Sequence, residues 1–198
     1  MPLWGATDSD ESKPKNLTTA QKKQVFANAS GWVLEAGSAL SGNDNTDADP
    51  EVLVAIGDLS TSIGAADITE VEMVTTTADK SEGFTISVRV RYNEPVDVVT
   101  TGGTPTLAVT NGNEGSGTGR GPHSLSYASG TGTNELIFSL AIAAANAATN
   151  ADDVLTVGAQ SIALNSGTIK DASGTASDAA VAISSAQGTA AGSVTVTA

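Results

Sequence analysis

The 198-residue sequence has no cysteine, few aromatic residues (4%) and only 9 Lys and Arg against 22 Asp and Glu. Without cysteine, no disulfide can hold the fold, and no thiolate is available as a nucleophile or a metal ligand. So few aromatic residues rule out a large aromatic core. The net charge of −13 disfavours direct nucleic-acid binding and fits a surface that resists nonspecific association.

Long apolar runs are also missing. No run approaches the roughly 20 residues that a membrane-spanning helix needs, so we expect no membrane segment. The first residues, 1–5, lead directly into Asp8, Asp10 and Glu11 rather than into the apolar stretch of a secretory signal. We therefore expect no secretory signal.

Histidine occurs once, at His123. A Ser–His–Asp triad would have to use this residue, which follows Gly119–Pro122 in a segment that we expect to be a flexible loop. Catalytic geometry needs rigid support, and a zinc site needs several His or Cys ligands. The sequence thus predicts no catalytic residues, no metal and no cofactor, and we interpret the protein as not an enzyme.

Asn and Asp alternate over residues 43–49 like the start of a calcium-binding EF-hand loop. Such a loop needs Gly at its sixth position and Glu at its twelfth, where this chain has Ala48 and Val54. We interpret the segment as a solvated acidic turn, with cation binding left open. Asp152 and Asp153 are interpreted as a hydrated turn between two strands, again with a cation as the alternative.

Residues 1–16 are polar and interrupted by proline, with Leu3 and Trp4 as an apolar pair. They predict an extended arm. Farther on, Thr18 and Gln21 have the spacing of a helix-capping box, which predicts a helix over residues 19–30.

Short apolar runs at residues 32–34 and 52–56 predict two buried strands. Residues 1–70 therefore form a small, mixed α and β part with little core of its own. We expect a neighbouring molecule to complete it, which makes it an anchoring part. Because tryptophan is favoured at binding hot spots, Leu3, Trp4 and Trp32 are the predicted partner-binding residues. For Trp4 the alternative is that its side chain folds back onto its own domain.

Beyond residue 70 apolar residues recur at every second position. In Phe84–Tyr92 they take every even position, which predicts a strand with one buried face and with Arg89 and Arg91 pointing outward. The predicted buried face consists of Phe84, Ile86, Val88, Val90 and Tyr92. The same alternation occurs at residues 71–74, 107–109, 125–127, 136–142, 155–157, 162–164, 181–183 and 194–196. Eight or nine short strands separated by turns predict an antiparallel β-sandwich over residues 71–198, and a mainly β protein.

Five glycines lie between Gly112 and Gly121. No Gly-Lys-Ser/Thr follows, so the segment is not a phosphate-binding P-loop. We expect a long, mobile hairpin connection at one end of the sandwich, where binding loops cluster, with Arg120 and His123 as an exposed binding pair.

Four blocks of the C-terminal part resemble a bacterial immunoglobulin-like (Ig-like) repeat family. They are Tyr92–Val98, Gly103–Leu107, Tyr127–Phe138 and Ile162–Ala172. Repeats of this family stack as β-sandwiches in large surface and adhesive proteins and share no active site. The resemblance implies an Ig-like sandwich that serves binding or display.

The N-terminal part is similar to the opening of virion structural proteins from marine tailed phages, cyanophages in particular. The similarity lies in Leu3–Gly5, Pro14–Lys15, Gly31–Trp32 and Pro50–Ala55. It implies a component of the virion, present in many copies or as a homo-oligomer, whose partners are the major capsid protein or other virion proteins. One Ig-like unit behind a short anchoring part is similar to phage capsid decoration, or cement, proteins. The alternative is an adhesive module of the neck, tail or fibres that binds host-surface glycans or proteins.

Overall fold

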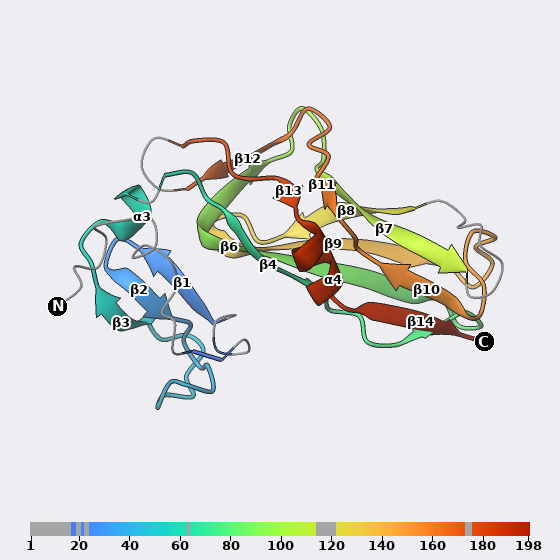
Figure 1. The fold of residues 1–198 in the computed structure, drawn as a ribbon, viewed down its shortest axis with the longest axis horizontal. Helices are drawn as coiled ribbons and strands as arrows, with labels where there is room; N and C mark the ends of the chain where they lie inside the picture. The colour runs from blue at the N-terminus through green and yellow to red at the C-terminus, as the bar shows by residue number, and fades with distance from the viewer. Residues whose placement is uncertain (1–16, 19–20, 22–23, 63, 114–121, 173–175) are drawn as a thin grey trace.

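The computed structural model describes residues 17–198 except 19–20, 22–23, 63, 114–121 and 173–175. Three of the predicted binding residues, Leu3, Trp4 and Arg120, lie outside the described residues. The described chain has a small three-stranded sheet followed by a long, curled sheet that packs on itself like a β-sandwich (Figure 1). The prediction of a mainly β protein is therefore confirmed, while membership of the Ig-like family stays a prediction.

The three-stranded sheet is an antiparallel meander. It consists of β1 (Val25–Asn28), β2 (Gly31–Leu34) and β3 (Glu51–Ala55), in that order. The tight β1–β2 turn ends at Gly31, whose backbone φ is +125°. A Cβ atom there would lie 2.1 Å from the carbonyl oxygen of Val54, so only glycine fits between these strands.

The helix predicted over residues 19–30 is wrong, because its second half is β1 and the turn into β2. The capping box itself is present: the Gln21 N–H donates to Thr18 Oγ1 (3.3 Å), and the Thr18 N–H donates to Gln21 Oε1 (2.9 Å). Residues from Val25 onward form a strand instead of a helix, because this strand pairs with Leu34 and Trp32 of β2 and shares a hydrophobic cluster with them. Tertiary burial here outweighs a local helix signal.

One face of the three-stranded sheet has its own hydrophobic cluster. Its buried members are Val25, Ala27, Trp32, Leu34 and Leu59. Leu59 comes from the short helix α3 (Leu59–Ser62), which closes the cluster after β3. This core is small and separate from the core of the sandwich.

The sandwich is formed by the strands that follow. In chain order they are β4 (Ile68–Met73), β5 (Ala78–Asp79), β6 (Phe84–Val99), β7 (Thr106–Asn113), β8 (His123–Ser129), β9 (Thr133–Ile142), β10 (Asp153–Thr156), β12 (Thr168–Asp171) and β14 (Ser193–Thr197). They pair in the order β12-β6-β9-β8-β7-β10-β14-β5, with β4 also on β6. The pairing is antiparallel except between β14 and β5. A two-stranded ribbon, β11 (Gln160–Ser161) with β13 (Ala182–Ile183), and the helix α4 (Ser185–Ala190) complete the fold.

Strand β6 is 16 residues long and bends in the middle. Its first half pairs with β4 and β9, and its second half pairs with β12. The register to β9 shifts between Arg91 and Val96, where Pro95 has no N–H for the ladder. At the same place Asn93 bonds Asp67 twice, through its N–H (3.0 Å) and its Oδ1 (2.7 Å), and so holds the preceding segment against the bend.

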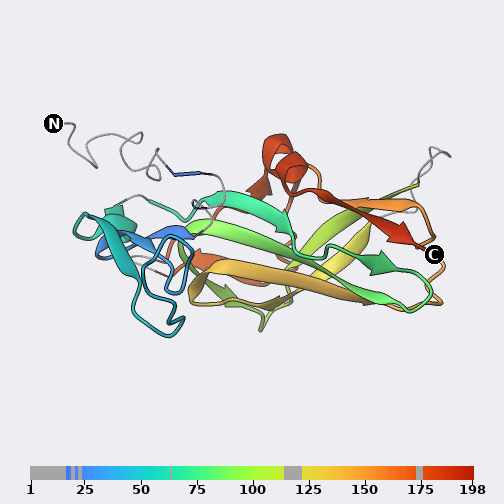
Figure 2. The ribbon, with the colours of Figure 1, turned by 90° about the horizontal axis from the view of Figure 1, so that it is seen from below.

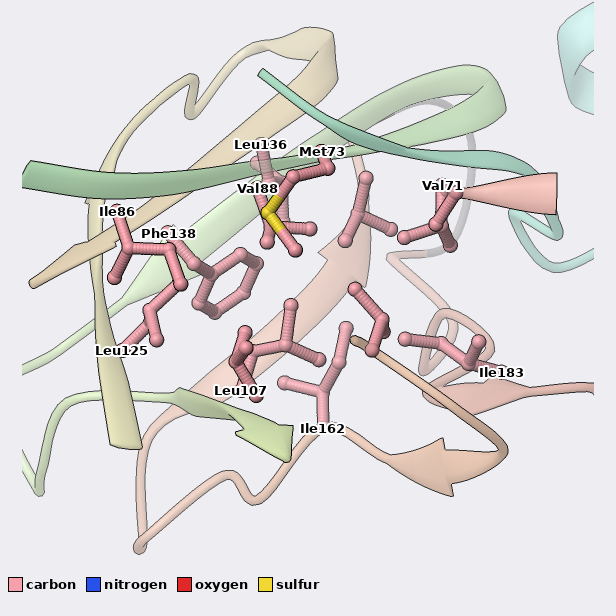
Figure 3. Close-up of a cluster of buried hydrophobic side chains, with 14 of the residues drawn as sticks. Val71, Met73, Ile86, Val88, Leu107, Leu125, Leu136, Phe138, Ile162 and Ile183 are labelled. Carbon is pink, nitrogen blue, oxygen red and sulfur yellow. The ribbon is translucent and has the colours of Figure 1, made fainter. Parts of the chain in front are cut away.

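The sandwich core fills the space between the two layers, as Figure 3 shows for side chains such as Val88, Leu107 and Phe138. Ile86, Val88, Val90 and Tyr92 are each 0% exposed, which confirms the predicted inner face; Phe84 is only partly buried. The Tyr92 hydroxyl donates to the Ala180 carbonyl (3.1 Å), and burial raises the pKa of this phenol well above its usual value.

The sandwich begins a few residues before the predicted boundary at residue 70. Strand β4 starts at Ile68, and Ala66 is 0% exposed within the sandwich core. The Ala180 N–H also donates to the Ala66 carbonyl (2.8 Å). Residues 66–70 therefore belong to the sandwich.

Helix α4 was not predicted from the sequence, although it has the same capping box as Thr18 and Gln21. The Gln187 N–H donates to Ser184 Oγ (3.3 Å), and the Ser184 N–H donates to Gln187 Oε1 (2.8 Å). Gln187 also donates from its Nε2 to the Ile68 carbonyl (2.7 Å), so this one side chain both caps the helix and fastens it to β4.

Val88 tests the register of β6. Val88→Asp would place an unpaired carboxylate opposite Phe138 in the dry core, and we expect a loss of about 4 kcal/mol in the free energy of unfolding. Thr85→Asp, on the exposed face of the same strand, should cost under about 1 kcal/mol. Urea unfolding followed by circular dichroism measures both, and equal losses would show that the register is misassigned.

Candidate functional site

The edge of the three-stranded sheet is an exposed apolar strand. Among the described residues, β3 pairs only with β2. Val52 is 48% and Leu53 36% exposed, whereas Val54 packs against the cluster around Trp32. Leu53 is an extra residue in the ladder, because Val52 pairs with Val33 and Val54 pairs with Trp32. An open edge of this kind offers unpaired backbone groups and apolar side chains to another chain.

The stretch of chain that contains β3 carries charge of one sign. No Lys or Arg occurs between residues 24 and 79. Exposed Asp44, Asp47 and Asp49 lie in the loop from β2 to β3, and exposed Glu51 is the first residue of β3. The apolar strand therefore lies beside a one-sign rim of negative charge.

A hollow of about 300 Å³ lies at the beginning of β3. It is lined by Ala36, Ser41, Gly42, Asn43, Ala48, Asp49 and Glu51. Its two charged lining residues are both carboxylates, Asp49 and Glu51, and the other lining groups are small or uncharged. The hollow thus suits a single extended cationic side chain.

The alternation of Asn and Asp over residues 43–49 shapes this loop. The Asn43 N–H donates to Ser41 Oγ (3.1 Å), the Asn45 N–H to Asn43 Oδ1 (3.1 Å), and the Asp47 N–H to Asn45 Oδ1 (3.0 Å). Each bond spans two residues, which is the hydrogen bond of an Asx-type turn. Within the described part of the chain, no group of three or more His, Asp or Glu could hold a metal ion. Turn formation accounts for the pattern that resembled an EF-hand loop.

The prediction that Trp32 contacts a partner is wrong for the folded chain. Trp32 is 1% exposed and lies in the cluster with Val25 and Leu34. Its indole Nε1 is buried and has no hydrogen-bond partner among the described residues. The sequence could not distinguish this inward position from an outward one, because all four residues of β2 are buried.

His123 was predicted to lie in an exposed loop, and this is also wrong. It is the first residue of β8, is 6% exposed and pairs with Val109 of β7. Its Nε2 lies 2.9 Å from Thr149 Oγ1 and 3.4 Å from Asn111 Nδ2. Asn111 in turn donates to the Ala148 carbonyl. The side chain thus ties β7 and β8 to the loop that precedes β10.

Of the two neighbouring aspartates, Asp152 faces solvent and Asp153 is buried. Asp152 is exposed, with a backbone φ of +66°, as expected for a turn, but Asp153 is 0% exposed and accepts the Asn150 N–H at Oδ2 (2.7 Å). Burial lowers the pKa of His123, and the negative charge of Asp153 opposes that shift. Thr149 is 0% exposed, so its hydroxyl is covered and cannot meet a substrate in this conformation. We interpret the His123–Thr149 contact as structural.

Arg91 was expected to point into solvent, but it is only 4% exposed. It forms an ion pair with Glu135 on the neighbouring strand β9. The Nε of Arg89 also lies 3.5 Å from Oε2 of Glu135. Burial lowers the pKa of the Arg91 guanidinium, and the carboxylate of Glu35, just after β2, opposes that shift. Since β1 also contacts β6, the three-stranded sheet lies against this outer face of the sandwich.

Comparison with known proteins gives no relatives: no family model, curated protein or solved structure matches the chain. Among the described residues, no helix is both long and apolar enough to span a membrane.

His123 makes stability depend on pH. Its pKa is lowered in the folded protein, so the unfolded chain, with a His pKa of about 6.5, binds a proton first as the pH falls. The stability is therefore fully present above pH ~6.5 and decreases from there down to the pKa of the folded state. His123→Gln should remove this slope. Because no other histidine is present, urea unfolding of both proteins between pH 7.5 and 5.5 isolates the effect, and parallel curves would contradict it.

Proposed function

We propose that this protein is a structural component of a phage particle, a capsid decoration protein seated through its N-terminal part and projecting a sandwich of Ig-like type. The observation that supports attachment through the N-terminal part is the open, apolar edge of β3 with its acidic rim. The proposal of a phage particle rests on a resemblance to phage virion proteins, which lies in Leu3–Gly5, Gly31–Trp32 and Pro50–Ala55. Its partners are then the major capsid protein or neighbouring virion proteins.

The two hydrophobic cores support different roles for the two parts, attachment for the three-stranded sheet and projection for the sandwich. The sandwich buries a large cluster of its own and satisfies most of its strands through pairing with one another. The three-stranded sheet has only five fully buried apolar residues in its cluster and leaves Val52 and Leu53 exposed. A part with so small a core gains most from burial against a neighbour.

The shape supports projection. In both views the three-stranded sheet lies at one end of the elongated molecule and the C-terminus lies at the other (Figures 1 and 2). The contact of β1 with β6 and the buried Arg91 join the two parts. A protein seated by its three-stranded sheet would therefore hold the far end of the sandwich away from the surface.

Copy number tests the proposed location. Quantitative mass spectrometry of purified particles should find about as many copies as shell subunits, on the order of hundreds, because decoration follows the repeat of the shell. A few tens of copies would instead indicate the neck, tail or fibre adhesin. Absence from the particles would overturn a virion role.

Carboxylate-to-lysine cross-linking on intact particles tests the orientation. Asp44, Asp47, Asp49 and Glu51 should couple to lysines of a shell protein, because they surround the proposed seat. Asp152 provides an internal control, since it is exposed and its N–H bonds Val196 at the far end of the sandwich (2.8 Å). Shell cross-links from Asp152 but not from the acidic loop would show that the protein is seated the other way round.

A further inference from the structure

We infer that the open edge of β3 binds an extended segment of a partner protein that carries a basic residue, adding a fourth strand to the three-stranded sheet. This inference deepens the proposed function, because it names the surface and the chemistry of the partner segment. It depends on three features of the described residues: an open edge, a one-sign rim and a hollow.

The open edge sets the mode of binding. Strand β3 offers five residues, Glu51–Ala55, whose outer backbone groups are not used by another strand among the described residues. An extended segment can satisfy them by main-chain hydrogen bonds, while Val52 and Leu53 bury apolar surface against its side chains. This is β-strand addition, which needs no preformed deep pocket.

The charge selects the partner. Residues 40–58 contain Asp44, Asp47, Asp49, Glu51 and Asp58 and no basic residue. Pairing β3 with β3 of a second copy would bring two such rims together, which opposes self-association. A segment with Lys or Arg beside its apolar residues meets the opposite charge instead.

The hollow fixes where the basic residue goes. It opens at the start of β3, and its charged lining groups, Asp49 and Glu51, are both carboxylates. A segment paired with β3 passes beside this hollow, so that a Lys or Arg at one end can enter it. Arginine matches carboxylates in two-point geometry, which gives the segment a defined register.

A blocked heptapeptide, Arg-Val-Thr-Val-Thr-Val-Lys, tests the surface with the full-length protein. We expect fluorescence anisotropy to show saturable binding that weakens between 0.05 and about 0.5 M salt, because the rim is screened. Hydrogen exchange should slow at residues 51–55. The same peptide with glutamate at both ends should bind at least about tenfold more weakly.

Variants assign the binding to β3. Val52→Lys and Glu51→Lys should each reduce the affinity at least about tenfold, since each sets positive charge against the basic peptide. Val99→Lys is the matched control, because Val99 is 50% exposed at the end of β6, away from the acidic loop. Unchanged circular dichroism and melting show that each variant is folded.

Three outcomes would overturn the inference. They are binding that is equal for the basic and the acidic peptide, binding that Val52→Lys leaves unchanged, and no slowing of exchange at β3 with saturating peptide. Sedimentation tests whether a second copy of this chain binds the edge of β3 instead. A dimer that Val52→Lys abolishes would show that the partner is a second copy. The cross-linking on particles is an independent test. Cross-links to the shell from residues 1–65 outside β3 and its acidic loop would support the proposed function and exclude this surface as the binding site.

Discussion

Strand β6 is the constraint on which most of the structure depends, because it buries its inner face in the sandwich core and, at Arg91, part of its outer face. Its inner face supplies Ile86, Val88, Val90 and Tyr92 to the sandwich core. On the other face, Arg91 is buried in an ion pair with Glu135 under the influence of Glu35. A guanidinium in that position needs its carboxylate partner, since an uncompensated buried charge costs several kcal/mol. The ion pair therefore fixes β6 against β9, and β1 of the three-stranded sheet also contacts β6.

The bend in β6 allows one strand to serve two sets of neighbours. Pro95 interrupts the ladder, and Asn93 replaces the lost pairing by bonding Asp67 on the segment that enters β4. The residues that resembled the Ig-like family at 92–98 thus have a defined structural task. The hairpin at 127–138 is similar: Gly130 has φ of +115°, and a Cβ there would lie 1.9 Å from the Glu135 carbonyl oxygen. These blocks are required by backbone geometry rather than by chemistry at a site.

The net charges of the two parts do not show how acidic and basic residues are distributed along the chain. The two parts have similar net charges, yet the stretch from 24 to 79, which contains β3, has no basic residue. The acidic loop keeps this edge from pairing with copies of itself and at the same time favours a basic partner. Protection against self-association and selection of a partner are then two effects of the same charges.

The sequence alone located most of the sandwich strands and the inner face of β6, because alternation with period 2 reports directly which side of a strand is dry. The strand predicted at 162–164 is only an isolated bridge at Ala163, and β5 and β12 were not predicted. The sequence also located the capping box of Thr18 and Gln21, since these residues are local, but missed the equivalent box of Ser184 and Gln187. It could not decide whether residues 25–30 form a helix or a strand, because Val25 and Ala27 become buried only when Leu34 and Trp32 pair with them. The positions of Trp32, His123 and Arg91 were likewise decided by the tertiary structure. Each is covered by residues distant in the sequence, and burial that arises from distant contacts leaves no periodic signal in a single chain.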